Sequence, residues 1–303
     1  MDVMSKTYEC GNCGASTDLP AEQISTMCAF CESPLVLSPD SIEGPAPELV
    51  APFIISKEMA LQKLATHLKQ QWLAPDALRR AVSPSRVRAI QVPFFMFDAK
   101  ARSRYSAEVG INWTETYTDT EMDSEGNVQT VTRTRTHTEW FSREGTHVYE
   151  YRKHLVCGSQ GIEEKDTNYI EPFDIGKAIP FSPELLAGVI SERFTVSKEK
   201  AEQICVEELE QSEKQNLSSF LPGDSSRAIR CTTEVTIKNN ATILLPIYVA
   251  SYKHDGKTIH LLVNGQSAQV GGDVPRSKTK IALLIAWIII FVLSSCCCVG
   301  VMT

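Results

Sequence analysis

Residues 113–140 read WTETYTDTEMDSEGNVQTVTRTRTHTEW, and threonine occupies every second position over much of this stretch. Successive side chains of a strand point to opposite faces, so this alternation places the threonines on one face of each of two strands. DSEGN (residues 123–127) supplies the turn. The stretch therefore predicts a long, mostly exposed two-stranded hairpin. A turn centred on Glu125 places Glu115 opposite Arg135, and such opposed charges favour the register.

The hairpin lies within residues 53–275, where helical and strand patterns occur together. Apolar residues at intervals of three or four predict a helix that begins near Ser56 and ends before Pro75. Ser182 and Ser197 mark the starts of two further helices. An antiparallel meander follows, with strands at Ala228–Lys238, Thr242–Lys253, Lys257–Val263 and, in a short fourth piece, Ser267–Val270. Asp-Gly within residues 254–257 and Asn-Gly within residues 263–266 form its hairpin turns. We therefore expect an α+β body with antiparallel sheets and a few helices.

Four of the ten cysteines form two Cys-x-x-Cys pairs near the N-terminus: Cys10, Cys13, Cys28 and Cys31. Tetrahedral zinc binds four thiolates at about 2.3 Å, and each pair places two thiolates on one tight turn. This spacing predicts a zinc ribbon over residues 1–37, with Zn²⁺ as the cofactor. A rubredoxin-type iron site uses the same ligands, but zinc is favoured because rubredoxin-like turns usually carry proline and aromatic residues packed close around the iron.

The charge distribution argues against a nucleic-acid role for the cysteine module. Residues 1–50 carry one lysine and eight acidic side chains, and the whole chain has a net charge of −7. A surface that grips phosphates needs lysine and arginine, so nucleic acid is not the expected partner. Residues 38–52 (SPDSIEGPAPELVAP) are rich in proline, glycine and acidic residues and predict a linker.

No motif predicts catalysis. A closed four-cysteine site leaves the metal no open position. GKT (residues 256–258) lacks the glycine of a phosphate loop, because Ser251 stands in its place. We find no Ser/His/Asp or Cys/His arrangement with a recognisable local signature, so we expect no enzyme. A second metal site is an alternative for four residues of a strand-rich stretch: His137, His147, His154 and Cys157. Exposed histidines on strands are the simpler interpretation.

The C-terminal residues 281–303 read IALLIAWIIIFVLSSCCCVGVMT and carry no charge. As a helix they extend about 34 Å, enough to cross a bilayer core. Arg276, Lys278 and Lys280 precede the run and no base follows it, so the positive-inside rule places residues 1–280 in the cytoplasm. We expect a single-pass transmembrane helix. The alternative, a buried helix of a soluble domain, is disfavoured because core helices carry a polar face.

Four segments resemble a family of bacterial membrane-anchored zinc-ribbon proteins, often labelled primosomal protein N-prime (replication factor Y), superfamily II helicase-like. They are YECGNCG with CAFCESPLV (8–36), VPFFMFDAKARSRYSAEVG (92–110), EPFDIGKAIPFSPELLAGVISERF (171–194) and LPIYVASYKHDGKTIHLLVNGQSAQVGGDVPRSKTKI (245–281). The chain departs from the family in CESPLV, where CGSPLV is commoner, and in its threonine-rich hairpin. It also lacks the phosphate loop and the length that two helicase lobes need.

The resemblance implies a bacterial inner-membrane location and a place in a membrane-stress complex of the phage-shock type or beside SPFH scaffold proteins. Together with the residues, it predicts a tail-anchored, cytoplasm-facing adaptor or scaffold with an unidentified protein partner. The bilayer would hold it through residues 281–303. The alternative function is a nucleic-acid-associated replication protein that uses the zinc ribbon for binding.

Overall fold

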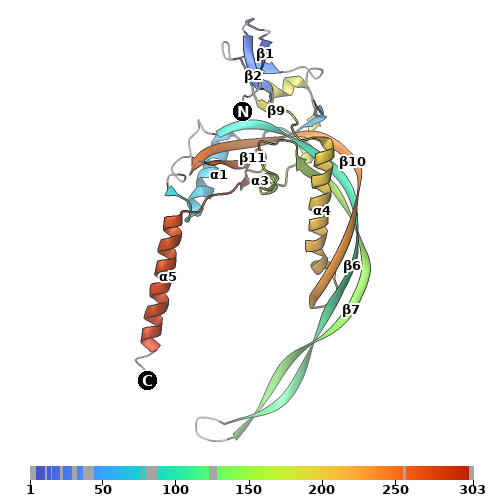
Figure 1. The fold of residues 1–303 in the computed structure, drawn as a ribbon, viewed down its shortest axis with the longest axis vertical. Coiled ribbons are helices and arrows are strands. Elements are labelled where there is room, and N and C mark those ends of the chain that lie inside the picture. Colours follow the sequence, from blue (N-terminus) through green and yellow to red (C-terminus); the bar gives the residue numbers. More distant parts are fainter. Residues whose placement is uncertain are drawn as a thin grey trace. The chain divides into compact units, whose positions relative to one another are not determined.

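The fold is described from a computed structural model of the chain. The described residues are 5–10, 12–14, 16–20, 23–28, 33–36, 44–76, 78, 87–122, 128–254 and 257–299. Within them, residues 5–7, 9, 17–20, 253–254, 257–258 and 290–299 are described by their backbone alone. Figure 1 traces the elements along the chain.

Most strands of the described chain belong to one mixed sheet of ten strands. They are β3 (Gln23–Met27), β4 (Pro34–Val36), β5 (Leu49–Val50), β6 (Val87–Met122), β7 (Val128–Cys157), β8 (Ile179–Pro180), β9 (Ile190–Glu192), β10 (Ser225–His254), β11 (Lys257–Asn264) and β12 (Val270–Gly271). The order along the sheet is β12-β11-β10-β6-β9-β3-β4, while β5, β7 and β8 pair off this path. A separate two-stranded sheet consists of β1 (Ser5–Glu9) and β2 (Ser16–Pro20).

Few helices occur in the residues that the structure describes. They are α1 (Lys57–Gln70), α3 (Glu164–Asn168), α4 (Lys198–Phe220) and α5 (Lys278–Val299), with 3-10 turns η3 (Ile175–Lys177) and η4 (Pro183–Leu186). The predicted starts near Ser56 and Ser197 are confirmed, since each serine Oγ accepts a backbone N–H three residues later at 3.3 Å. The helix expected after Ser182 is only the single turn η4.

The predicted fold class is wrong in its layout. The sequence indicated an independent zinc ribbon beside a body of antiparallel sheets, yet β3 pairs with β9 and joins the main sheet. Two parallel pairs, β5 with β10 and β6 with β9, make this sheet mixed. The physical reason is burial: Ile24 of β3 is fully buried against Val50, Leu186 and Leu244. A ribbon this small has little core of its own, so its apolar residue packs with distant segments.

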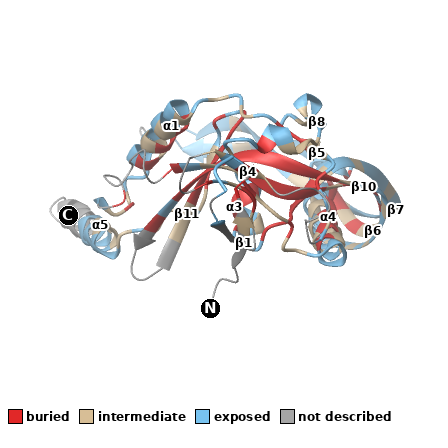
Figure 2. Ribbon diagram, turned by 90° about the horizontal axis from the view of Figure 1, so that it is seen from above, coloured by how far each residue is buried: buried red, intermediate tan, exposed pale blue. Residues whose placement is uncertain are grey.

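Two compact units divide the chain. The first contains residues 1–96, 156–201 and 241–303, and the second contains residues 97–155 and 202–240. In the first unit, α1 lies on one face of the sheet and buries Leu64 and Leu68 against β6, β10 and β11. Figure 2 shows buried residues along β10 and β11 and on one side of α1.

The second unit contains the predicted hairpin, which is confirmed. β6 and β7 pair over strands of 36 and 30 residues, longer than the threonine-rich stretch suggested. The predicted turn at residues 123–127 lies outside the described residues. Glu115 bonds to His137 at 2.8 Å and not to Arg135. Arg135 instead lies over the Tyr117 ring, 5.4 Å from its centroid, because long side chains reach diagonal neighbours across a ladder.

The strands after α4 also differ from the prediction. β10 is one continuous strand of 30 residues, where the sequence indicated two strands separated near Asn239. The hairpin with β11 is as expected, with Ser251 opposite His260. Lys257 and Thr258 of the GKT segment belong to β11, a strand, whereas the same residues of a phosphate loop open a helix.

The prediction of a single-pass transmembrane helix over residues 281–303 is wrong. In the part of the chain that the structure describes, no helix has both the length and the apolarity that crossing a membrane requires. The predictions of a membrane location and of a tail anchor rested on this span, so they lose their support. Lys280 Nζ instead bonds to Asp76 Oδ1 at 2.6 Å and to two backbone carbonyls of the first unit, those of Trp72 and Ala74.

Candidate metal centre

The first Cys-x-x-Cys pair occupies the turn between β1 and β2. Glu9 pairs with Ser16, so the strands end on either side of the turn and Cys10 follows β1 directly. The turn closes through the Gly14 N–H, which donates to the Cys10 carbonyl at 2.8 Å. Gly14 has φ +72°, a left-handed conformation that glycine adopts without the strain a Cβ would add.

The second pair begins directly after β3. Cys28 follows Met27, which is opposite Pro34 of β4, and the Cys28 N–H donates to the Ser33 carbonyl at 2.8 Å. Cys10 and Cys28 therefore each stand directly after a strand of a β-hairpin, which fixes their backbone positions. Cys31, the fourth predicted ligand, lies outside the described residues.

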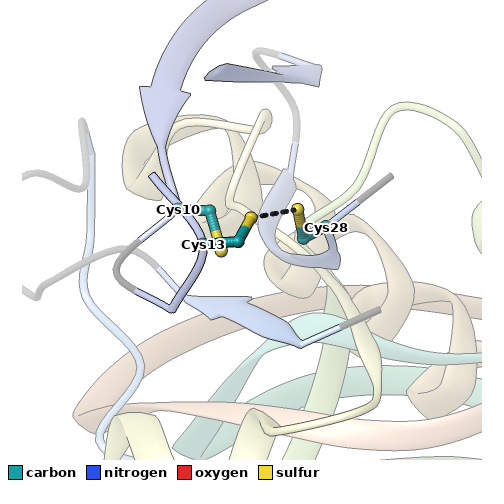
Figure 3. Close-up of side chains that lie close together, drawn as sticks. All are labelled: Cys10, Cys13 and Cys28. Atoms are coloured by element: carbon teal, nitrogen blue, oxygen red, sulfur yellow. Dashed lines mark hydrogen bonds between the residues drawn. The ribbon is translucent and has the colours of Figure 1, made fainter. Parts of the chain in front are cut away.

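Of the four cysteines in these two pairs, the three that the structure describes, Cys10, Cys13 and Cys28, converge (Figure 3). All their Sγ atoms lie within 4.8 Å of one another, and Cys13 Sγ is 3.8 Å from Cys28 Sγ. Thiolates bound tetrahedrally at about 2.3 Å are separated by about 3.8 Å, while a disulfide requires about 2.05 Å. The group can therefore hold a metal ion, which confirms the predicted metal binding in this general form.

The three thiols differ in burial, and hydrogen bonding favours the thiolate form of one of them. Cys10 and Cys28 are buried with Leu35 and Tyr8, whereas Cys13 is exposed. Cys10 Sγ lies 3.2 Å from Ser33 Oγ. This hydrogen bond, followed by those of the Cys13 and Asn12 backbone groups, lowers the pKa of the Cys10 thiol. A lower pKa raises the thiolate fraction near neutral pH, and the thiolate is the form that binds metal.

The histidines considered for a second site do not converge. His137 bonds to Glu115 at 2.8 Å, His147 to Glu213 at 2.9 Å and His154 to Glu208 at 2.9 Å. Burial raises the pKa of the Cys157 thiol, which keeps it protonated. Over the described ranges, Cys10, Cys13 and Cys28 form the only group of three ligand-type side chains that come together.

The sequence reasoning missed a buried acid in the second unit. Glu213 accepts hydrogen bonds from Ser103 Oγ at 2.6 Å and from Tyr151 Oη at 2.8 Å, and it also bonds to His147. Burial raises the pKa of Glu213, but these hydrogen bonds outweigh it, so the pKa lies below its usual value. Glu213 lies one helical turn after Leu209 and one before Leu217, so a helix places it on the same buried face. This position in the sequence could have identified it as a buried acid.

The chain is 28% identical over 251 residues to the uncharacterized protein YdjG of Bacillus subtilis (strain 168), a match that covers 80% of this chain and 67% of that protein. No protein-family profile matches the chain, and no solved structure matches it.

Proposed function

We propose that the cysteine module binds one structural zinc ion through Cys10, Cys13, Cys28 and Cys31, and that the chain is a non-enzymatic adaptor for a partner protein. The observation that carries this proposal is the 3.8 Å separation of Cys13 Sγ and Cys28 Sγ on two hairpin turns. Cys31 belongs to the proposal because its spacing from Cys28 repeats that of Cys13 from Cys10.

A structural role fits the surroundings of the thiols better than a catalytic one. Four thiolates fill the coordination sphere of zinc and leave no position for a substrate or an activated water. Cys10 and Cys28 are also buried, at 3% and 1% exposure. The ion would fix the two turns relative to each other, and with them the ends of β1 and β3.

The charge of the module favours a protein partner with a basic surface. Residues 1–50 carry eight acidic side chains and one lysine, a balance that repels phosphate groups. The same balance attracts lysine- and arginine-rich protein surfaces and raises the rate of their association. Nucleic-acid binding, the alternative function, is disfavoured by this charge balance.

The adaptor proposal is tested by chemical crosslinking and capture with the full chain as bait. The Cys10→Ser/Cys13→Ser double variant removes the metal site, and Cys231→Ser is the matched control, since Cys231 lies in the second unit near Thr233. We expect a partner that the wild type and the control retain at moderate salt and that the double variant loses. Equal capture by all three proteins, or tight salt-sensitive DNA binding by the wild type, contradicts the proposal.

A further inference from the structure

A second candidate site lies in the first unit, on the main sheet. β11, β10, β6 and β9 are neighbours there in this order. Side chains alternate between the two faces of a strand. Val87, Tyr248 and Leu261 point to the face that α1 covers. The residues next to them along each strand therefore point to the opposite face.

That opposite face is hollowed into a cavity of about 400 Å³. Its polar lining consists of Arg88 of β6, Ser251 of β10, His260 of β11 and Glu192 of β9. Ser251 and His260 are directly opposite each other in the ladder. The volume falls within the range of small-ligand sites, and polar groups from four adjacent strands meet in it.

The polar groups of the cavity divide into donors and an acceptor. Among the described residues, no hydrogen bond or ion pair joins the Arg88 side chain to another residue, and we assign its guanidinium as the cationic donor of the cavity. Ser251 Oγ lies 3.0 Å from His260 Nδ1. If Ser251 donates this bond, His260 carries its proton on Nε2 and offers it as a second donor.

The acceptor is Glu192, which a neighbouring loop holds in place. Ser159 Oγ donates to Glu192 Oε2 at 2.7 Å, and Ser159 Oγ in turn accepts the Gly161 N–H at 3.0 Å. Three aliphatic side chains complete the lining, those of Ile90, Ile162 and Val249.

We infer that this cavity binds a small amphoteric molecule with an apolar body, of the size and kind of an aliphatic amino acid. Arg88 and His260 take its carboxylate, since a guanidinium fork matches a carboxylate. Glu192 takes its ammonium group, and the aliphatic side chains contact its body. This inference goes beyond the adaptor function and does not depend on the metal centre.

The arrangement supports binding and not hydrolysis. A serine–histidine nucleophile needs a carboxylate that orients the histidine. Across the described ranges, no carboxylate oxygen lies within hydrogen-bond distance of His260. Ser251 therefore orients the imidazole, and no covalent step follows.

The test is isothermal titration of the full chain with three probes that share a 3-methylbutyl body. L-leucine carries both charged groups, 4-methylpentanoate carries only the carboxylate, and 3-methylbutylamine carries only the amine. We expect leucine to bind about tenfold or more tightly than 4-methylpentanoate, and the amine to give no heat. Absence of binding by all three at millimolar concentration overturns the inference, as does amine binding equal to that of leucine. Equal affinity for leucine and 4-methylpentanoate overturns the role of Glu192.

Variants assign the contacts. Arg88→Gln is expected to weaken leucine binding by about tenfold or more, because it removes a charge-assisted hydrogen bond. Arg102→Gln is the matched control, since Arg102 is also an exposed arginine of β6 but lies outside the cavity, and it should bind leucine like the wild type. Glu192→Gln should lower leucine affinity without changing that for 4-methylpentanoate. Unchanged leucine binding by Arg88→Gln overturns the site. If that variant does not fold, Glu192→Gln decides the question by the same leucine comparison.

Discussion

Replacing Glu213 by glutamine tests how the second unit is held together. The carboxylate is 2% exposed and bonds to Ser103, His147 and Tyr151 at 2.6–2.9 Å. Glutamine keeps the shape but turns one acceptor oxygen into an NH₂ donor that faces hydrogen-bond donors. Hydrogen bonds to a charged group contribute about 1.5–3 kcal/mol each, and part of this returns through the remaining oxygen. We therefore expect Glu213→Gln to lower the free energy of unfolding by about 3 kcal/mol.

The assay is urea unfolding followed by near-ultraviolet circular dichroism. Glu207→Gln is the control, because Glu207 is an exposed glutamate of the same helix, and it should change stability by less than about 0.5 kcal/mol. The pH dependence gives a second measure. The pKa of Glu213 is lowered in the folded state, so its stabilisation is present above the unfolded-state pKa and is lost as pH falls through the folded-state pKa. Glu213→Gln should lose less stability than the wild type on acidification below about pH 4.5. Equal stability of Glu213→Gln and wild type at pH 7 would refute the reasoning.

Three further predictions concern the first unit. Leu64→Ala should lower the free energy of unfolding by about 3 kcal/mol in urea titrations, because Leu64 is fully buried; a loss below about 1 kcal/mol would argue against the packing of α1 on the sheet. Ser33→Ala should raise the pKa of the Cys10 thiol, measured as the pH profile of its alkylation in the metal-free protein; an unchanged profile would mean that Ser33 does not act on this thiol. Cys10→Ser/Cys13→Ser should speed amide hydrogen exchange in β3 and also in β9, its partner strand; exchange confined to residues 5–36 would show that the module unfolds alone.

Local patterns predicted the local elements well. The threonine alternation is a property of the two strands themselves, so it indicated the hairpin directly. The serine N-caps similarly predicted the starts of α1 and α4, because capping involves residues three positions apart. The two Cys-x-x-Cys pairs also predicted the convergence of Cys10, Cys13 and Cys28, because two such pairs together form the ligand pattern of a single metal ion.

Long-range pairing could not be predicted in this way. β3 joins the sheet through β9, a three-residue strand whose partner lies more than 150 positions earlier in the chain. No local pattern marks such a contact. The candidate ligand cavity could not be predicted for the same reason. Its residues Arg88, Glu192 and His260 come from separate strands that only the sheet order brings together. The uncharged run after Lys280 predicted a membrane span, and the structure contradicts this prediction.

The central claim is that Cys10, Cys13, Cys28 and Cys31 hold one zinc ion, and the most direct test is native mass spectrometry with elemental analysis of the full-length protein. We predict one zinc per chain in the wild type and a metal-free protein when Cys28 and Cys31 are both replaced by serine. Iron in the wild-type protein, or zinc that remains bound after those two replacements, would contradict this assignment of the four zinc ligands.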